Sequence, residues 1–68
     1  MEKDWTQVYT VDKQYKAELA KEILEEAGIN AVIMNKRDSA YRSFGEFEVY
    51  VNKEFAETAR KKLQDSEL

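Results

Sequence analysis

The chain has 68 residues, with 14 acidic and 11 basic side chains, neither cysteine nor histidine, and a formal net charge of −3 at pH 7. Without those two residue types it has no disulfide, no thiolate or imidazole metal ligand, and no Cys–His or Ser–His catalytic arrangement. The acidic balance argues against a general nucleic-acid binder, which needs a cationic face against phosphates. We therefore expect no metal, no cofactor and no nucleic-acid partner.

The length and the hydropathy pattern indicate one small domain over residues 1–68. A chain of this size buries only about 60% of its unfolded surface, so its core must be small. The hydrophobic fraction of 43% is nevertheless typical of a folded chain. The first residues, Met1 to Trp5, have no apolar signal region, and no apolar run is long enough to span a membrane. We expect a soluble, cytoplasmic protein without membrane contact.

The first half of the chain predicts a strand followed by a helix. Residues 5–11 are rich in β-branched and aromatic side chains, which favour a strand. Residues 13–27 follow as a helix, with Asp12 as its expected N-cap and Gly28 as a left-handed C-terminal stop after which Ile29 folds back. The apolar stripe expected at helical spacing consists of Tyr15, Leu19, Ala20, Ile23, Leu24 and Ala27.

The second half predicts two strands joined by a polar loop, and then a second helix. Residues 31–35 form an apolar run too short for a helix, residues 36–45 lack a periodic pattern, and residues 46–51 alternate as a strand does. The strand faces carry Phe47, Val49 and Val51 on one side and Glu46, Glu48 and Tyr50 on the other. Asn52 is the expected cap of a helix over residues 53–63, with an apolar stripe of Phe55, Ala56, Ala59 and Leu63.

The element order β-α-β-β-α predicts an α+β fold, a ferredoxin-like plait that lacks its last strand. A right-handed crossover gives a three-stranded antiparallel or mixed sheet in the order 2-3-1, with two helices on one face. The other face would be bare, and it looks too apolar to be left in water. The strand over residues 5–11 would be an unpaired edge. Trp5, Tyr9 and Tyr50 are the expected interface residues, and a homodimer through the sheet face or through that edge is one hypothesis.

The loop over residues 36–45 is the expected binding loop, because it gathers cations in an acidic chain. Arginine offers a planar fork and lysine a point charge to a phosphate or carboxylate, and an aromatic ring can stack on a ligand. The candidate binding residues are Lys36, Arg37, Asp38, Ser39, Tyr41 and Arg42. The alternative interpretation is a solvated hairpin loop, in which Asp38 and Ser39 shape a turn and the cations keep strand edges from aggregating.

Glu46 and Glu48 present the one arrangement that invites a catalytic interpretation. Two residues on one face of a strand lie about 7 Å apart, a separation found between the paired carboxylates of inverting glycosidases. Alternating exposed glutamates are ordinary in strands, however, and a core this small leaves little room for a deep cleft. We therefore expect no enzymatic activity.

The chain also resembles a family of small bacterial domains of unknown function, described as signal-transducing proteins and grouped with PII-like, ferredoxin-like folds. The resemblance lies in Val8–Thr10, Ala17–Ala20, Leu24–Ile29 with Ala31–Val32, Asn35–Tyr41 and Phe44–Val51. It implies a βαββα module that binds or signals without an established reaction. True PII proteins carry a long nucleotide-binding loop and a double repeat, and some relatives append cysteine-bearing tails. This chain has none of these features, so nucleotide binding is not implied.

Two hypotheses follow from these patterns. The first is a non-enzymatic regulatory or protein-interaction module in signal transduction, which meets an unknown protein partner through its bare sheet face, its exposed strand edge and the loop over residues 36–45. The alternative is a small-molecule sensor that binds an anionic ligand through residues 36–45.

Overall fold

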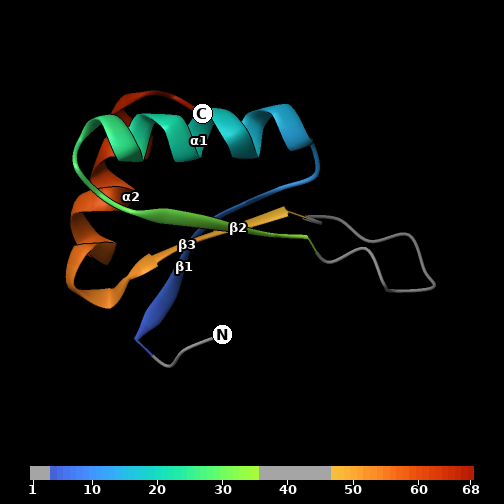
Figure 1. The fold of residues 1–68 in the computed structure, drawn as a ribbon. Coiled ribbons are helices and arrows are strands. Elements are labelled where there is room, and N and C mark those ends of the chain that lie inside the picture. The colour runs from blue at the N-terminus through green and yellow to red at the C-terminus, as the bar shows by residue number, and fades with distance from the viewer. Residues whose placement is uncertain (1–3, 36–46) are drawn as a thin grey trace.

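A computed structural model describes residues 4–35 and 47–68 (Figure 1). Within these residues the elements are β1 (Trp5–Val11), α1 (Gln14–Glu26), β2 (Ala31–Asn35), β3 (Phe47–Asn52), the 3-10 turn η1 (Lys53–Phe55) and α2 (Ala56–Asp65). The predicted β-α-β-β-α order is therefore confirmed, with η1 and α2 together replacing the single helix expected over 53–63. Neither α1 nor α2 has the length and apolar character that a membrane crossing requires.

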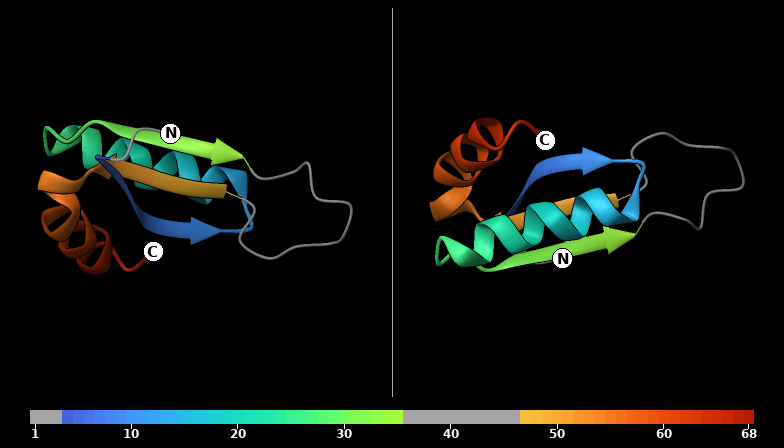
Figure 2. Two further views of the ribbon diagram at one scale, coloured as in Figure 1. Left: turned by 90° about the horizontal axis from the view of Figure 1, so that it is seen from below. Right: turned by 90° about the horizontal axis from the view of Figure 1, so that it is seen from above.

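The three strands form one antiparallel sheet in the order β1-β3-β2. The strand β3 lies in the centre and pairs with both neighbours, so β1 and β2 are the two edges. Both helices lie on the same side of this sheet, with α1 across it and α2 beside β1 (Figures 1 and 2). The α+β fold is confirmed, and the arrangement is compatible with a ferredoxin-like plait.

The core lies between the sheet and the two helices. Val49 and Val51 of β3 and Leu24 of α1 are its largest fully buried side chains. Each helix adds two small residues and one leucine, so the helix backbones can come close to the sheet: Ala17, Ala20 and Leu24 from α1, and Ala56, Ala59 and Leu63 from α2. Alternation along β3 then leaves Glu48 and Tyr50 on the opposite side of the sheet.

The buried stripe of α1 differs from the predicted one. Tyr15 is 63% exposed and Leu19 is 42% exposed, whereas Ala17 is fully buried. Both stripes satisfy helical spacing, but only one can face the sheet, and the stripe with alanines at its centre lets the helix pack more closely. Phe55 was also expected inside, and it is 41% exposed because it ends η1 instead of lying on the inner face of α2.

The start of α1 also differs from its prediction, whereas the cap after β3 is confirmed. Lys13 is the N-cap of α1 and makes no capping side-chain hydrogen bond, so Asp12 lies outside the first turn. The carbonyl of Lys13 accepts from the amide of Ala17 at 3.2 Å. Asn52, in contrast, accepts through its side chain from the amide of Glu54 at 3.0 Å, as the sequence predicts.

The end of α1 is a Schellman motif, as predicted. Gly28 has a φ of 82°, the amide of Ile29 donates to the carbonyl of Leu24 at 2.9 Å, and the amide of Gly28 donates to the carbonyl of Glu25 at 3.0 Å. Ile29 is 3% exposed and belongs to the same core as Leu24. The motif satisfies carbonyls that a helix end leaves unpaired, and it directs the chain into β2.

We expect Gly28→Ala to lower the free energy of unfolding by about 1 kcal/mol, because a left-handed backbone is unfavourable for a residue with a Cβ. A Cβ at this position meets no atom within 4 Å, so the loss comes from the backbone and not from a clash. Gly28→Asn is the matched variant and should lose less, since asparagine tolerates this conformation. Urea unfolding measures both, and equal stability of Gly28→Ala and the parent chain would contradict the assignment.

We expect Asn52→Ala to lower the free energy of unfolding by about 1 kcal/mol, the usual loss for a capping side chain. Asp12→Ala is the control, because Asp12 was predicted to cap and does not, and its change should stay within about 0.5 kcal/mol. Thermal unfolding of the two variants measures the difference. A larger loss from Asp12→Ala than from Asn52→Ala would be the wrong order for this structure.

Candidate functional site

The predicted binding loop lies outside the described residues, which break off after Asn35 and resume at Phe47. The roles of Lys36, Arg37, Asp38, Ser39, Tyr41 and Arg42 therefore stay predictions, and so does the pairing of Glu46 with Glu48. The residues on either side, Asn35 and Phe47, are paired across two antiparallel strands.

The side of the sheet opposite the helices carries a mixed surface that we name the open face. Residues directly opposite each other in an antiparallel pair share a face. Tyr50 is opposite Gln7 on one side and Val32 on the other, and the same rule assigns the remaining positions. The open face consists of Trp5, Gln7, Thr10, Val32, Met34, Glu48, Tyr50 and Asn52.

The apolar part of the open face reaches from β1 to β2. Val32 is 38% exposed and Met34 is 36% exposed, and Trp5 and Tyr50 are half-buried. Tyr50 is the direct cross-strand neighbour of Val32, so the ring and the branched side chain meet at the centre of the face. A surface that combines aromatic rings, methionine and valine is typical of protein contacts.

The predicted interface residues Trp5 and Tyr9 lie on opposite sides of the sheet. The register of β1 against β3 shifts between Gln7 and Tyr9, which leaves Val8 without a register partner. One extra residue reverses the face of every later side chain in a strand. Trp5 therefore lies on the open face with Tyr50, whereas Tyr9 is opposite Val49 and packs against the core.

A hydrogen bond joins two residues of the open face. The Tyr50 hydroxyl donates to Glu48 Oε1 at 2.9 Å, because side chains two apart on a strand point the same way. The bond holds the proton on the hydroxyl, and together with partial burial and the negative charge of Glu48 it raises the pKa of Tyr50 above its ordinary value of 10.0. At neutral pH the centre of the open face thus carries a neutral phenol held by a carboxylate.

The edge of the sheet at β1 is partly covered. A groove between β1 and α2 is lined mainly by apolar side chains, among them Val8, Tyr9, Leu63 and Leu68. Arg60 extends from α2 and donates through Nη2 to the carbonyl of Gln7 at 3.3 Å. This bond occupies a backbone acceptor on the outer side of β1.

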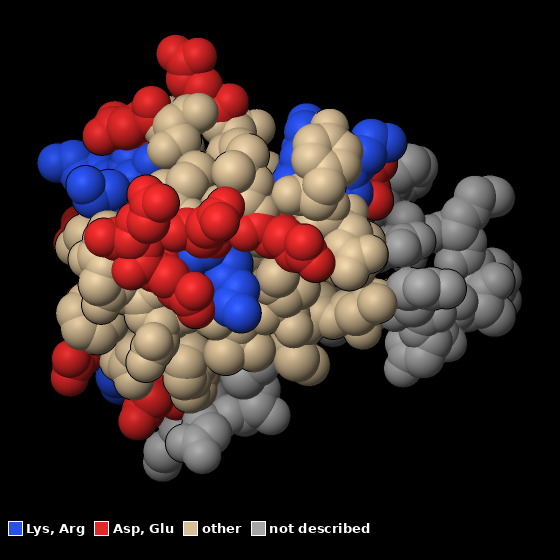
Figure 3. All heavy atoms as spheres, turned by 45° about the horizontal axis from the view of Figure 1, so that its top comes forward, with Lys and Arg blue, Asp and Glu red and all other residues tan. Residues whose placement is uncertain are grey.

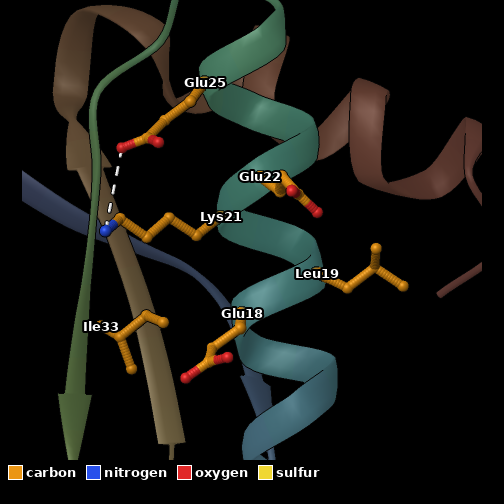
Figure 4. A pocket seen from close by; sticks show the side chains of 6 residues that line it. All are labelled: Glu18, Leu19, Lys21, Glu22, Glu25 and Ile33. Atoms are coloured by element: carbon orange, nitrogen blue, oxygen red, sulfur yellow. Dashed lines mark ion pairs between the residues drawn. The ribbon is translucent and has the colours of Figure 1, made fainter.

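The opposite edge, at β2, lies next to an acidic helix surface. Figure 3 shows a band of acidic side chains across the exposed side of α1, which carries four glutamates and two lysines. A shallow groove separates α1 from β2 and includes Ile33. Glu18 and Glu25 point toward β2 on either side of Lys21, and Lys21 Nζ lies 3.9 Å from Glu25 Oε2 (Figure 4). This groove was not predicted from the sequence. The glutamates of residues 13–27 and the uncharged strand at 31–35 are the features of the sequence that could have indicated it.

The described residues contain no group of three or more His, Cys, Asp or Glu side chains placed to hold a metal ion.

We expect the pKa of Tyr50 to fall toward 10.0 in Glu48→Gln, because the substitution removes the charged acceptor that favours the protonated phenol. NMR titration of the Tyr50 ring carbon measures this pKa. Since folding raises it, the bond contributes stability that is present below pH 10.0 and is lost as the pH rises through the folded value. Tyr50→Phe should therefore show a smaller loss of stability between pH 9 and pH 11 than the parent chain. An unchanged Tyr50 pKa in Glu48→Gln would show that the carboxylate is not its cause.

Comparison with protein families gives a match over residues 5–67 to the model of the family described as "Putative prokaryotic signal transducing protein". No curated protein and no solved structure matched the chain. The family match covers β1 through α2, and so it includes both edges of the sheet and the whole of the open face.

Proposed function

This chain belongs to the prokaryotic signal-transducing family whose model it matches, and from that premise we propose that it is a non-enzymatic protein-interaction module. Its open face is the surface that meets the partner, and the module acts in the cytoplasm. The observation that carries the proposal is the one-sided architecture. Both helices pack on one side of the sheet and leave aromatic and aliphatic side chains of all three strands on the other.

The chemistry of the open face supports a protein partner. Aromatic residues and methionine are enriched in protein interfaces, and buried tyrosine and tryptophan often dominate their binding energy. Trp5 and Tyr50 are half-buried in the free chain, so part of their ordering is already complete before a partner arrives. The Tyr50–Glu48 hydrogen bond holds one of these rings in place.

The whole chain contains neither cysteine, a strong nucleophile of enzymes, nor histidine, their most frequent general base. Glu48, which the sequence suggested as one of a catalytic pair, accepts a hydrogen bond from Tyr50. The grooves among the described residues are open and shallow surface features. These observations favour binding over catalysis.

The proposal is tested with a photo-crosslinking amino acid at Met34 on the open face, in the organism that carries this chain. Leu19 on α1 is the matched control position, because the two side chains are 36% and 42% exposed. We expect discrete adducts from position 34 that are absent at position 19, because Met34 lies on the open face and Leu19 lies on the helix side of the sheet. Mass spectrometry resolves the adducts.

A second substitution tests whether the adducts at position 34 come from a specific contact of the open face or only from the exposure of that position. Tyr50→Ala should reduce the adducts at position 34 by about tenfold, the effect of losing one central aromatic contact. Tyr15→Ala removes the same ring from an exposed position on α1 and should leave the adducts unchanged. Amide spectra show whether each variant keeps its fold. Equal labelling from positions 19 and 34 would contradict the proposal, as would adducts that do not respond to Tyr50→Ala in a folded chain.

A further inference from the structure

The free edge of β2 has a row of backbone groups whose direction follows from the register. The amide of Lys53 donates to the carbonyl of Asp4 at 2.7 Å, just beyond the last residues of the β1–β3 pair. Bonded and non-bonded pairs alternate along an antiparallel ladder, so Thr6 and Val51 form the next bonded pair. The backbone groups of Val51 thus point to β1, and those of its neighbour Tyr50 point to β2.

The same alternation assigns the residues of β2. Val32 is opposite Tyr50 and Met34 is opposite Glu48, and the backbone groups of these two β3 residues point toward β2. The amides and carbonyls of Val32 and Met34 are therefore bonded to β3. The amides and carbonyls of Ala31, Ile33 and Asn35 then point outward. No described strand pairs with this edge.

The two edges of the sheet differ in how they are protected. The edge at β1 has a register irregularity at Val8 and an arginine on the carbonyl of Gln7, and both features hinder the addition of another strand. The strand β2 pairs in regular register over all five residues and contains neither proline nor a charged side chain. It is therefore the edge that can accept a strand.

We propose that the β2 edge binds an extended segment of a partner protein in which basic and apolar side chains alternate. The added strand runs antiparallel to β2, the more stable pairing. Its residues on the helix side of the sheet lie over the groove, where Glu18 and Glu25 flank Lys21, so the acidic excess of the groove favours basic side chains. Its residues on the other side lie next to Val32 and Met34, so they are apolar.

The charge of α1 selects this occupant over a second copy of the chain. Two β2 strands paired antiparallel about a twofold axis would extend the sheet and bring two α1 helices to the same side of it. Each α1 carries four glutamates and two lysines, so the acidic surfaces would face each other. A basic segment would instead be attracted by the acidic surface of α1. The inference rests on the proposed interaction function and adds the chemistry of the partner.

The test uses an acetylated seven-residue peptide of alternating lysine and valine, with a glutamate–valine peptide as its charge control. We expect the lysine peptide to slow hydrogen exchange at the outward amides of Ala31, Ile33 and Asn35. At a peptide concentration about ten times Kd, exchange should slow about tenfold, because only the free fraction exchanges. The glutamate peptide should leave these amides unchanged. Protection of the outward amides by both peptides would overturn the charge assignment.

Backbone methylation distinguishes strand addition from adsorption onto the acidic helix. In the antiparallel register a lysine opposite Ile33 directs its amide toward β2, and the valines direct theirs away. A peptide N-methylated at its lysines should therefore not bind, and the isomer N-methylated at its valines should bind like the parent peptide. Equal binding of the two methylated peptides would overturn the proposal.

Two pairs of substitutions that change the net charge by the same amount test the charge of the groove. Glu18→Gln with Glu25→Gln should weaken binding of the lysine peptide about fivefold, the scale of two partly screened ion pairs. Glu26→Gln with Glu57→Gln makes the same charge change on other surfaces of α1 and α2 and should alter Kd less than twofold. An equal effect of both pairs, or a dimer formed through β2, would contradict the inference. The peptide measurements report on the β2 edge, whereas the crosslinks report on the open face. Either proposal can therefore fail while the other is supported.

Discussion

The alternation of β3 at the centre of the sheet is the constraint on which the rest of the structure depends. Val49 and Val51 are fully buried under the helices. The alternating residues Glu48 and Tyr50 lie on the open face. Both edge strands take their register from β3, so a slip of one residue would exchange a core side chain for an open-face one. The burial of two valines therefore determines which side chains the whole sheet shows to water.

The one-sided packing of two short helices leaves this small domain with two different kinds of accessible surface. The open face offers rings and aliphatic side chains, which suit a contact between folded surfaces. The β2 edge offers unused backbone groups beside the glutamates of α1, which suit an extended basic segment. At the β1 edge, Arg60 occupies the carbonyl of Gln7, and the register irregularity at Val8 hinders the addition of another strand. The described part of this small domain thus offers two surfaces for the contacts that we propose.

Local rules predicted the parts of the fold that depend on a few neighbouring residues. Gly28 and Asn52 act as the sequence indicates, because a left-handed turn and a side-chain cap each involve residues two to five positions apart. The same rules were wrong for Asp12, since the helix begins one residue later than the polar side chain suggests. They were also wrong for Tyr15 and Leu19, because helical spacing allows two stripes and says nothing about which one the sheet will contact.

The sequence by itself determined the order of the elements, the end of α1, and the division of β3 into an inner and an outer face. Only the tertiary structure decided that Trp5 and Tyr9 lie on opposite sides of β1, that Ala17 faces the core, and which edge of the sheet is left unprotected. The physical reason is the range of the interactions. Periodicity and caps arise within a few residues, whereas the register of β1 is set by pairing with β3, about forty residues later in the chain.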